Sequence, residues 1–232
     1  MTKAVILAGG QGKRLQPLTF SIPKPLLSFG KKTIIQLLFE QLHKYGIKDI
    51  IISTGYLAKH VQDYCQDGSQ WGLNISYQHE NMSLGTAGPL SLLKEQLRKE
   101  KTFLMMNGDL VTKINFNGLI KFHEENKNIL TVAWKEFSTQ CPFGVLKMRG
   151  NNVFEIEEKP TITYKISCGI YALEALCLEY IPSEMYFTVP DLVQRLSKAN
   201  LKVGAFEIVD YWKGIETLND VTEVLENFED LQ

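Results

Sequence analysis

Two basic side chains near the start of the chain stand in a setting that suits a polyphosphate. A glycine-rich turn, Gly9–Gly12, follows a short apolar run and leads directly into Lys13 and Arg14. Glycines let the backbone come close to a ligand, and consecutive exposed N–H groups form a concave anion site. Arg14 adds a planar fork of donors, and Lys24, between two prolines, is expected on an extended, stiffened stalk. One polyphosphate held by backbone amides, Arg14 and Lys24 is the simplest chemistry that uses all of these groups.

An acidic residue, Asp109, closes the turn Asn107-Gly108-Asp109 directly after the apolar run 102–106. In an open α/β sheet, ligands bind at the carboxyl ends of the strands. Mg²⁺ prefers oxygen ligands and often shares the phosphates of a substrate. Asp109 is therefore a candidate magnesium ligand. Because Asn-Gly-Asp is also strong turn chemistry, a simple turn is the alternative interpretation.

The glycine-rich turn is part of a longer pattern with defined spacing: Leu7-Ala8-Gly9-Gly10-x-Gly12-x-Arg14-Leu15-x-Pro17-Leu18-Thr19, then Pro23-Lys24-Pro25-Leu26. This pattern resembles the signature of sugar-1-phosphate nucleotidyltransferases, also called NDP-sugar pyrophosphorylases. The resemblance implies that an NTP and a sugar 1-phosphate react, with Mg²⁺ as cofactor, to give an NDP-sugar and pyrophosphate. It implies catalytic roles for Arg14, Lys24 and Asp109. It also implies that nucleotide contacts come from Leu7, Ala8, Gly9, Gly10, Gly12, Lys13 and Arg14.

A second loop, 80–90, holds the nucleobase in that family, and its part 84–90 is similar to the GTP-using mannose-1-phosphate members. Gly85 lets a flat ring approach the backbone closely. A carboxylate at Glu80 only accepts hydrogen bonds, which suits the adjacent N1–H and N2–H donors of guanine and disfavours thymine and uracil. Glu80, Gly85 and Thr86 are the predicted base site. Cytosine is not excluded, and Thr86 is also a candidate helix cap.

A third motif, Glu157-Glu158-Lys159-Pro160, resembles the family's sugar site, in which the Glu binds sugar hydroxyls and the Lys binds the sugar phosphate. Two further segments, 143–145 and 167–171, match neighbouring parts of that site. The family usually carries Asn where Ser167 stands, which leaves one sugar contact open. The predicted sugar-phosphate site consists of Gly144, Glu158, Lys159, Ser167 and Gly169. For the Glu-Glu-Lys-Pro tetrad, a solvated strand end is the alternative.

The second metal-binding carboxylate departs from the common pattern. Most relatives place an Asp two residues after Trp212, where this chain has Gly214. Cytidylyl-transferring relatives place an acid four residues after the Trp, and the segment 216–220 looks like that version. Glu216 is therefore the candidate second Mg²⁺ ligand, with Asp210 in reserve. The alternative is an acid at a helix start, favoured by the helix dipole.

Together, these motifs predict that the protein transfers a guanylyl group from GTP to a sugar 1-phosphate of the mannose or manno-heptose type. The Glu216 segment favours a second hypothesis, a CTP-dependent enzyme like glucose-1-phosphate cytidylyltransferase. Gly214 and Ser167 motivate a third, a regulatory subunit that binds sugar nucleotides without turnover. In both enzyme hypotheses the sugar phosphate attacks the α-phosphorus in line, so that catalysis is positioning plus charge neutralisation.

Apolar runs and turn residues predict the elements that position these side chains. In the first half we expect strands at 4–7, 49–53, 74–78 and 102–106, and helices at 34–42, 58–65 and 85–97. In the second half we expect strands at 130–134, 144–148, 153–156, 167–173 and 203–209, and helices at 187–196 and 218–228. Strands that alternate with helices predict right-handed crossovers.

The predicted fold is an α/β protein with a Rossmann-like three-layer αβα sandwich on a mixed, mainly parallel sheet. We expect one nucleotidyltransferase domain over 1–232, with a nucleotide-binding half at about 1–135 and a sugar-phosphate-binding half at about 136–232. The substrate-binding region 140–175 is expected on the same sheet.

The composition excludes several other classes of protein. With 232 residues, 44% hydrophobic and 22% charged, the chain can form one large domain with a sizeable core. The net charge of −1 argues against a nucleic-acid surface, and no apolar run reaches transmembrane length. The four cysteines lack C-x-x-C spacing and are expected as free thiols. We expect a soluble cytoplasmic protein without nucleic-acid or membrane partners, and leave its oligomeric state open, a homodimer being one option.

Overall fold

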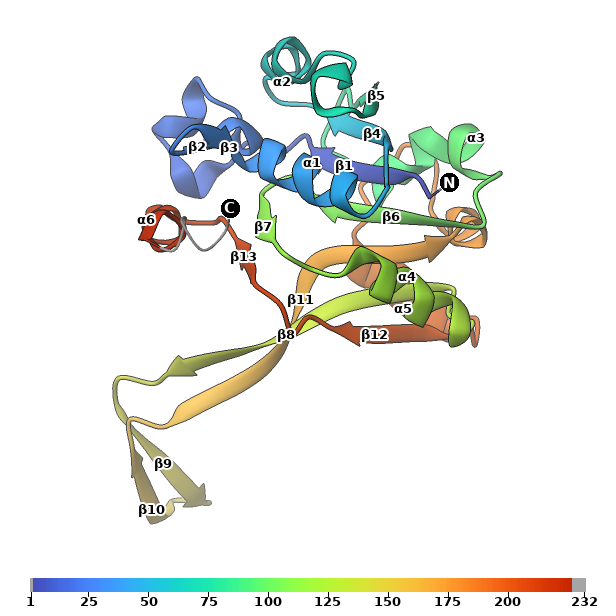
Figure 1. Cartoon of the computed structure of the whole chain (residues 1–232). Coiled ribbons are helices and arrows are strands. Elements are labelled where there is room, and N and C mark those ends of the chain that lie inside the picture. Colours follow the sequence, from blue (N-terminus) through green and yellow to red (C-terminus); the bar gives the residue numbers. More distant parts are fainter. Residues whose placement is uncertain (1, 227–232) are drawn as a thin grey trace.

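A seven-stranded sheet forms the centre of the computed structural model, which describes residues 2–226 (Figure 1). Its strands, in spatial order, are β12 (Val203–Glu207), β8 (Leu130–Gln140), β11 (Thr161–Glu174), β6 (Thr102–Asn107), β1 (Ala4–Ala8), β4 (Asp49–Thr54) and β5 (Asn74–His79). Neighbours are parallel except at β11, which runs antiparallel to both β6 and β8. The expected mixed, mainly parallel sheet is confirmed.

Helices cover both faces of this sheet. They are α1 (Ile34–Lys44), α2 (Ala58–Cys65), α3 (Lys94–Leu97), α4 (Phe116–Glu125) and α5 (Val189–Lys198). α6 (Leu218–Glu226) lies apart from them, with Val224 buried beside Leu15 and Phe29. Because side chains alternate along a strand, Ile6 and Ile52 pack under α1, α2 and α4, whereas Val5 and Ile51 pack under α3 and α5 on the opposite face. This confirms the predicted three-layer αβα architecture. Within residues 2–226, none of the helices has the length and apolarity that a membrane crossing requires.

One expected helix differs from the observed structure. The segment 85–97 is a 3-10 helix (Gly88–Leu93) followed by the single turn of α3. The reason lies in another segment, because the N–H groups of Ala87 and Gly88 both donate to the carbonyl oxygen of Phe187, at 2.9 and 2.8 Å. Thr86 therefore caps no helix of its own; its Oγ1 accepts from the N–H of Val189, at the start of α5. Residues 227–228 of the expected closing helix lie outside the described residues.

The strands β8 and β11 continue as a two-stranded ribbon beyond the sheet. Their ladder pairs residues 161–167 with residues 140–134, and β9 (Gly144–Arg149) and β10 (Asn152–Glu158) form a separate antiparallel pair at its far end. We call residues 135–166 the arm; in Figure 1 it projects away from the rest of the molecule. The expectation that 144–148 and 153–156 join the main sheet is wrong, since these strands pair with each other.

Two further strand pairs and a third apolar cluster connect the loop after β1 with the end of the described chain. β2 (Ser28–Phe29) pairs with β3 (Lys32–Thr33), and β7 (Leu110–Thr112) pairs with β13 (Trp212–Gly214). Leu15, Phe29, Ile215 and Val224 are buried together. This packing holds residues 13–15 beside residue 216, although 200 positions separate them in the sequence.

A small polar cluster is buried beneath the sheet. His123 of α4 is fully buried, and its Nδ1 lies 2.8 Å from Thr131 Oγ1, which also accepts from Asn128 Nδ2 at 3.0 Å. The Nε2 of His123 has no hydrogen-bond partner among the described residues. Burial lowers the pKa of His123 to about 4, so the imidazole is neutral in the folded protein at neutral pH.

We predict that His123 makes the protein less stable as the pH falls from 7 to 5. An unfolded histidine titrates near pH 6.5. Between that pH and about 4, the unfolded state therefore binds one more proton than the folded state, and this binding lowers the free energy of the unfolded state. The loss at pH 5 is about 2 kcal/mol. Urea unfolding at both pH values should show this loss in the wild type and not in His123→Phe. The exposed His60→Gln serves as control, and an unchanged pH dependence in His123→Phe would contradict the assignment.

Candidate active site

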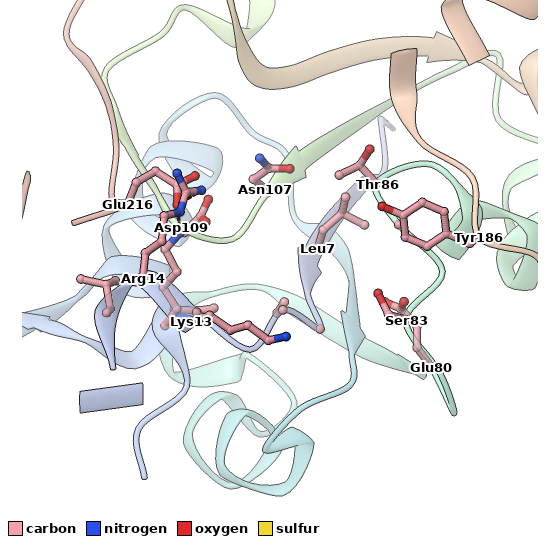
Figure 2. Close-up of a pocket in the computed structure, with 18 residues that line it drawn as sticks. Leu7, Lys13, Arg14, Glu80, Ser83, Thr86, Asn107, Asp109, Tyr186 and Glu216 are labelled. Carbon is pink, nitrogen blue, oxygen red and sulfur yellow. Dashed lines mark hydrogen bonds and ion pairs between the residues drawn. The ribbon is translucent and has the colours of Figure 1, made fainter. Parts of the chain in front are cut away.

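A cavity of about 370 Å³ opens at the carboxyl ends of β1 and β6 (Figure 2). Its volume is typical of small-molecule sites, and its place is where ligands bind in open α/β sheets. Among the residues that line it are all those singled out above for the nucleotide: Leu7, Ala8, Gly9, Gly10, Gly12, Lys13, Arg14, Glu80, Gly85 and Thr86. Lys24, Asp109 and Glu216 line the same cavity.

The glycine-rich turn after β1 offers its backbone to this cavity. Gly12 has a φ of +59°, and its carbonyl oxygen accepts from Thr19 Oγ1 at 2.9 Å. A methyl group on Gly9 would lie 2.9 Å from Glu80 Oε1, whereas one on Gly10 would meet nothing within 4 Å. Within residues 2–226, no hydrogen bond joins the N–H of residues 10–12 to another residue. These amides are therefore available to an anion.

Four charged side chains form a connected cluster at one end of the cavity. Lys24 Nζ lies 2.5 Å from Asp109 Oδ2 and 2.8 Å from Glu216 Oε2, and Arg14 Nη2 lies 2.7 Å from the same Glu216 oxygen. Lys24 is buried, whereas Arg14 is exposed. Burial raises the pKa of Asp109, and the charge of Lys24 opposes that shift. The positive charges of Lys24 and Arg14 thus balance the negative charges of Asp109 and Glu216 at the end of the cavity where phosphate groups are expected.

The backbone at Lys24 differs from the expected extended stalk. Lys24 begins a 3-10 turn (Lys24–Leu26), and only the preceding Pro23 is extended, with φ −61° and ψ 141°. Two backbone bonds close the turn: Leu26 N–H donates to the oxygen of Pro23 at 2.8 Å, and Leu27 N–H to that of Lys24 at 3.1 Å. These bonds outweigh the preference that a following proline imposes.

Glu216 reaches Asp109 through the pairing of β7 with β13. The N–H of Ile215 donates to the carbonyl oxygen of Asp109 at 3.0 Å, and Ile215 is fully buried. Asp220 Oδ2 then accepts from the N–H groups of Glu216 and Thr217, at 3.0 and 2.7 Å. Glu216 therefore precedes α6, as the helix-start alternative required, while its side chain contacts Lys24 and Arg14. Asp210, the reserve candidate, does not line the cavity.

The carboxylates of Asp109 and Glu216 fit a hard divalent cation. Both already converge on one cation, the ammonium of Lys24. Within residues 2–226 there is no group of three or more His, Cys, Asp or Glu side chains that would hold a metal ion by themselves. Mg²⁺ is commonly held by one or two carboxylates, with substrate phosphates and water completing its shell. The donor set present matches that mode and leaves the remaining positions to phosphate oxygens.

The opposite end of the cavity is chemically different. In Figure 2, Glu80, Ser83, Thr86 and Tyr186 lie across the cavity from Arg14 and Glu216. Glu80 Oε1 accepts from Ser53 Oγ at 2.8 Å, and Oε2 accepts from the N–H of Leu84 at 3.4 Å. A carboxylate accepts about four hydrogen bonds, so acceptor capacity remains. Burial raises the pKa of Glu80.

Sequence reasoning missed several residues of the lining, among them Ser83, Asn107 and Tyr186. Asn107 belongs to the same turn, Asn107-Gly108-Asp109, that singled out Asp109, so its place at the strand end was the available signal. Tyr186 follows no recognisable motif. It reaches the cavity because Phe187 exchanges backbone hydrogen bonds with the loop 84–88, and such long-range pairing leaves no local trace.

None of the five residues predicted for the sugar phosphate lines the cavity, and they fall into two groups by position. Gly169 has a φ of +67° and lies against Asn107, because a Cβ there would stand 2.6 Å from Asn107 Nδ2. Ser167 Oγ lies 3.1 Å from the hydroxyl of Tyr171. Gly144, Glu158 and Lys159 instead belong to the arm. Gly144 pairs with Glu158. Gly144, Glu158 and Lys159 do not line the cavity of their own chain.

Comparison with known sequences gives relatives that transfer nucleotides to sugar phosphates. The chain is 33% identical over 184 residues to a mannose-1-phosphate guanylyltransferase catalytic subunit beta from Dictyostelium discoideum (77% of this chain, 51% of the relative). It is 32% identical to a mannose-1-phosphate guanyltransferase from Yarrowia lipolytica (92% and 60%) and 30% identical to a UTP–glucose-1-phosphate uridylyltransferase from Synechocystis (92% and 62%). The chain thus spans between 51% and 62% of these relatives.

Solved structures share the fold. A putative glucose-1-phosphate thymidylyltransferase from Bacillus anthracis superposes with a TM-score of 0.81 at 24% identity, covering 100% of this chain and 97% of that one. HddC from Yersinia pseudotuberculosis, solved with GMP-PN, gives a TM-score of 0.78 at 26% identity, covering 98% and 100%. The family model described as nucleotidyl transferase matches residues 3–230. With its sheet, glycine-rich loop and charged cavity, the chain belongs to the nucleotidyl transferase family.

Proposed function

We propose that the protein transfers GMP from GTP to a sugar 1-phosphate of the mannose or manno-heptose type, giving a GDP-sugar and pyrophosphate. The observation that carries this proposal is the single cavity with two chemically distinct ends. One end joins free loop amides to Arg14, Lys24, Asp109 and Glu216, and the other presents the Glu80 carboxylate. A nucleoside triphosphate has the same division into an anionic tail and a base with hydrogen-bonding edges.

The reaction needs little chemistry from the protein itself. An oxygen of the sugar phosphate attacks the α-phosphorus of GTP, the bond from that phosphorus to the bridging oxygen breaks, and pyrophosphate leaves with the electron pair. The nucleophile is already anionic, so no general base is required. Arg14 binds the leaving pyrophosphate and Lys24 stabilises charge at the α-phosphate, which makes catalysis positioning plus charge neutralisation.

Asp109 and Glu216 are the residues that would hold Mg²⁺. The ion, when bound, neutralises negative charge on the phosphate oxygens. Lys24 already contacts both carboxylates. The protein therefore keeps its own cation at the place where phosphate and metal charges meet.

The preference for guanine rests on the loop 80–90 and on the relatives. Glu80 is an acceptor facing a cavity, and the N1–H and N2–H groups of guanine are adjacent donors. Relatives that are 32–35% identical are named as mannose-1-phosphate guanylyltransferases or guanyltransferases. The four cysteines are all free thiols, which fits a reducing compartment, and we assign the reaction to the cytoplasm.

The first prediction of the proposed function concerns Arg14. Arg14→Ala should lower turnover by about 10²–10³-fold, because one preorganised charge that stabilises the leaving group is removed. The fold should survive, since Arg14 is exposed and does not belong to the core. Pyrophosphate release measures the rate, and circular dichroism measures folding. Arg98→Ala, at an exposed ion pair with Glu95, is the matched control and should leave turnover unchanged. Near-normal turnover of Arg14→Ala would rule out its assigned role.

The second prediction concerns Glu80. Glu80→Gln should lower kcat/KM for GTP by roughly 10–100-fold and change the values for UTP and dTTP far less, because the amide turns a donor toward the donors of guanine. A panel of nucleotides with mannose 1-phosphate gives these values. Their ratio does not depend on the fraction of folded enzyme. A wild-type preference for CTP would instead favour the cytidylyl alternative.

The same residue gives a pH dependence. Burial raises the pKa of Glu80, and guanine recognition needs the charged carboxylate, which is present above that pKa. The preference for GTP over UTP in the wild type should therefore decline as the pH is lowered through this raised pKa. Glu80→Gln should show no such decline. An equal decline in both proteins would assign the titration to another group.

A further inference from the structure

We propose that two copies of this chain exchange their arms, so that Glu158 and Lys159 of one copy complete the sugar-phosphate end of the other copy's cavity. This inference rests on the proposed function and deepens it, because it assigns the sugar-phosphate subsite to two chains. It commits to one partner, a second identical copy, and it makes each active site depend on dimer formation.

The hairpin at the end of the arm has two faces of different character. Ile156 pairs with Leu146 and Val153 pairs with Met148, which places exposed apolar side chains opposite one another. The intervening Lys147 forms ion pairs with Glu155 and Glu157, at 2.8 and 3.3 Å. Apolar residues on one face and charged residues on the other are typical of a sheet that buries one side. Within residues 2–226 the apolar face has no cover, and Ile156 is 63% exposed.

The position of the arm separates its sugar-site residues from the cavity of the same chain. β11 passes Asn107, which lines the cavity, at Gly169, and the ladder with β8 runs without interruption from Ser167 to Thr161. At about 3.3 Å per residue, this ladder moves the chain roughly 20 Å away before Lys159 is reached. Figure 1 shows the same separation, with β9 and β10 at the far end of the arm.

Carboxylates already neutralise two of the three cations that line the cavity among residues 2–226. Arg14 and Lys24 are paired with Glu216 and Asp109, and Lys13 is the cavity-lining cation for which no ion pair is found within residues 2–226. A triphosphate and a sugar phosphate together carry more negative charge than Lys13 offsets, so a further cation is expected. Lys159 is the cation that the sugar-site motif offers, and it stands on the arm. A partner that inserts its arm supplies this charge together with the carboxylate of Glu158.

The rim of the cavity also offers apolar surface that such an arm can cover. Met82, Met185 and Tyr186 are 65%, 59% and 68% exposed, and Tyr186 lines the cavity. The chain therefore carries an uncovered apolar face on the arm and an uncovered apolar rim at the cavity. Two such surfaces on one chain are complementary in a two-fold dimer, where each copy gives its arm and receives the other.

The exposed area is sufficient for a stable dimer. Large apolar side chains along the arm are about half exposed: Phe137, Phe143, Leu146, Met148, Val153, Phe154, Ile156, Ile162 and Tyr164. Together they expose roughly 800 Å² if a large side chain can bury about 150–200 Å², which is the area per partner of a standard interface. Because each of the two copies contributes one arm, the dimer has two such contact areas.

The decisive experiment uses heterodimers purified through two different tags after co-expression. One chain carries Arg14→Ala and the other Lys159→Ala, each inactive as a homodimer. Arm exchange brings an intact loop and an intact arm together at one of the two sites, so about half of the wild-type activity per dimer should return. If the arm served its own chain, this heterodimer would be inactive, and that result would overturn the proposal.

The matched control places both substitutions in one chain and pairs it with a wild-type chain. With exchanged arms, each site then lacks either Arg14 or Lys159, so activity should be lost. If the arm served its own chain, the wild-type site would keep about half of the activity. The two arrangements thus predict opposite results for the two heterodimers. Full activity of the Lys159→Ala homodimer would also overturn the proposal.

A second measurement does not depend on turnover and so separates this proposal from the proposed function. Light scattering should give the mass of a dimer for the wild type and of a monomer for Ile156→Asp, because a charge then stands in the apolar face of the hairpin. Leu176→Asp, at a 50% exposed position outside the arm, should remain dimeric. A monomeric wild type, or a dimer unaffected by Ile156→Asp, would overturn arm exchange. Absent pyrophosphate release with an intact, arm-dependent dimer would instead argue against the proposed reaction.

Discussion

The ammonium of buried Lys24, held between the carboxylates of Asp109 and Glu216, is the interaction on which the candidate active site depends. It joins three segments that are far apart in the sequence: the loop after β1, the end of β6 and the turn before α6. Buried charges are tolerated when they are paired, and here burial pushes the pKa of Asp109 upward while Lys24 opposes the shift. Removing any one of the three partners would leave an unbalanced charge. A phosphate or a divalent ion that enters the cavity can exchange these contacts for its own, so the arrangement that stabilises the site is also suited to binding.

Backbone pairing and apolar packing around this cluster hold its charged side chains in place. The parallel strands β1 and β6 end side by side, which places the glycine-rich loop and Asp109 at one edge of the sheet. The pairing of β7 with β13 and the buried cluster of Leu15, Phe29, Ile215 and Val224 then bring Glu216 to the same edge. Each of these supports is apolar or backbone in nature, so it does not compete for the charges that it positions. The polar groups of these charged residues therefore face the cavity instead of the core.

The two halves of the chain contribute to the proposed reaction in different ways. The first half provides most of the cavity lining, from loops after neighbouring strands, and Tyr186 and Glu216 of the second half complete it. The second half supplies the antiparallel strand β11, which places Gly169 against the cavity-lining Asn107 and belongs to the arm along its first residues. A strand that is paired on the main sheet along part of its length and on a free ribbon along the rest links the nucleotide site to an external surface. In the proposed dimer, this link couples the sugar-phosphate subsite to association.

The sequence by itself determined the strands and most helices of the sheet, the class of fold, and the residues of the loops 7–14 and 80–86 that line the cavity. Those features depend on local information: apolar runs, glycines at a strand end, and acids or bases at fixed spacing. Only the tertiary structure decided that Lys24 begins a 3-10 turn, that 85–97 is not one helix, and that Tyr186 reaches the cavity, because each depends on hydrogen bonds or packing from a distant segment. The length of β8 and β11, and with it the distance of Glu158 and Lys159 from their own cavity, was likewise set by pairing between strands. An alternating pattern shows that a strand has a face to bury, but it does not name the surface that covers it.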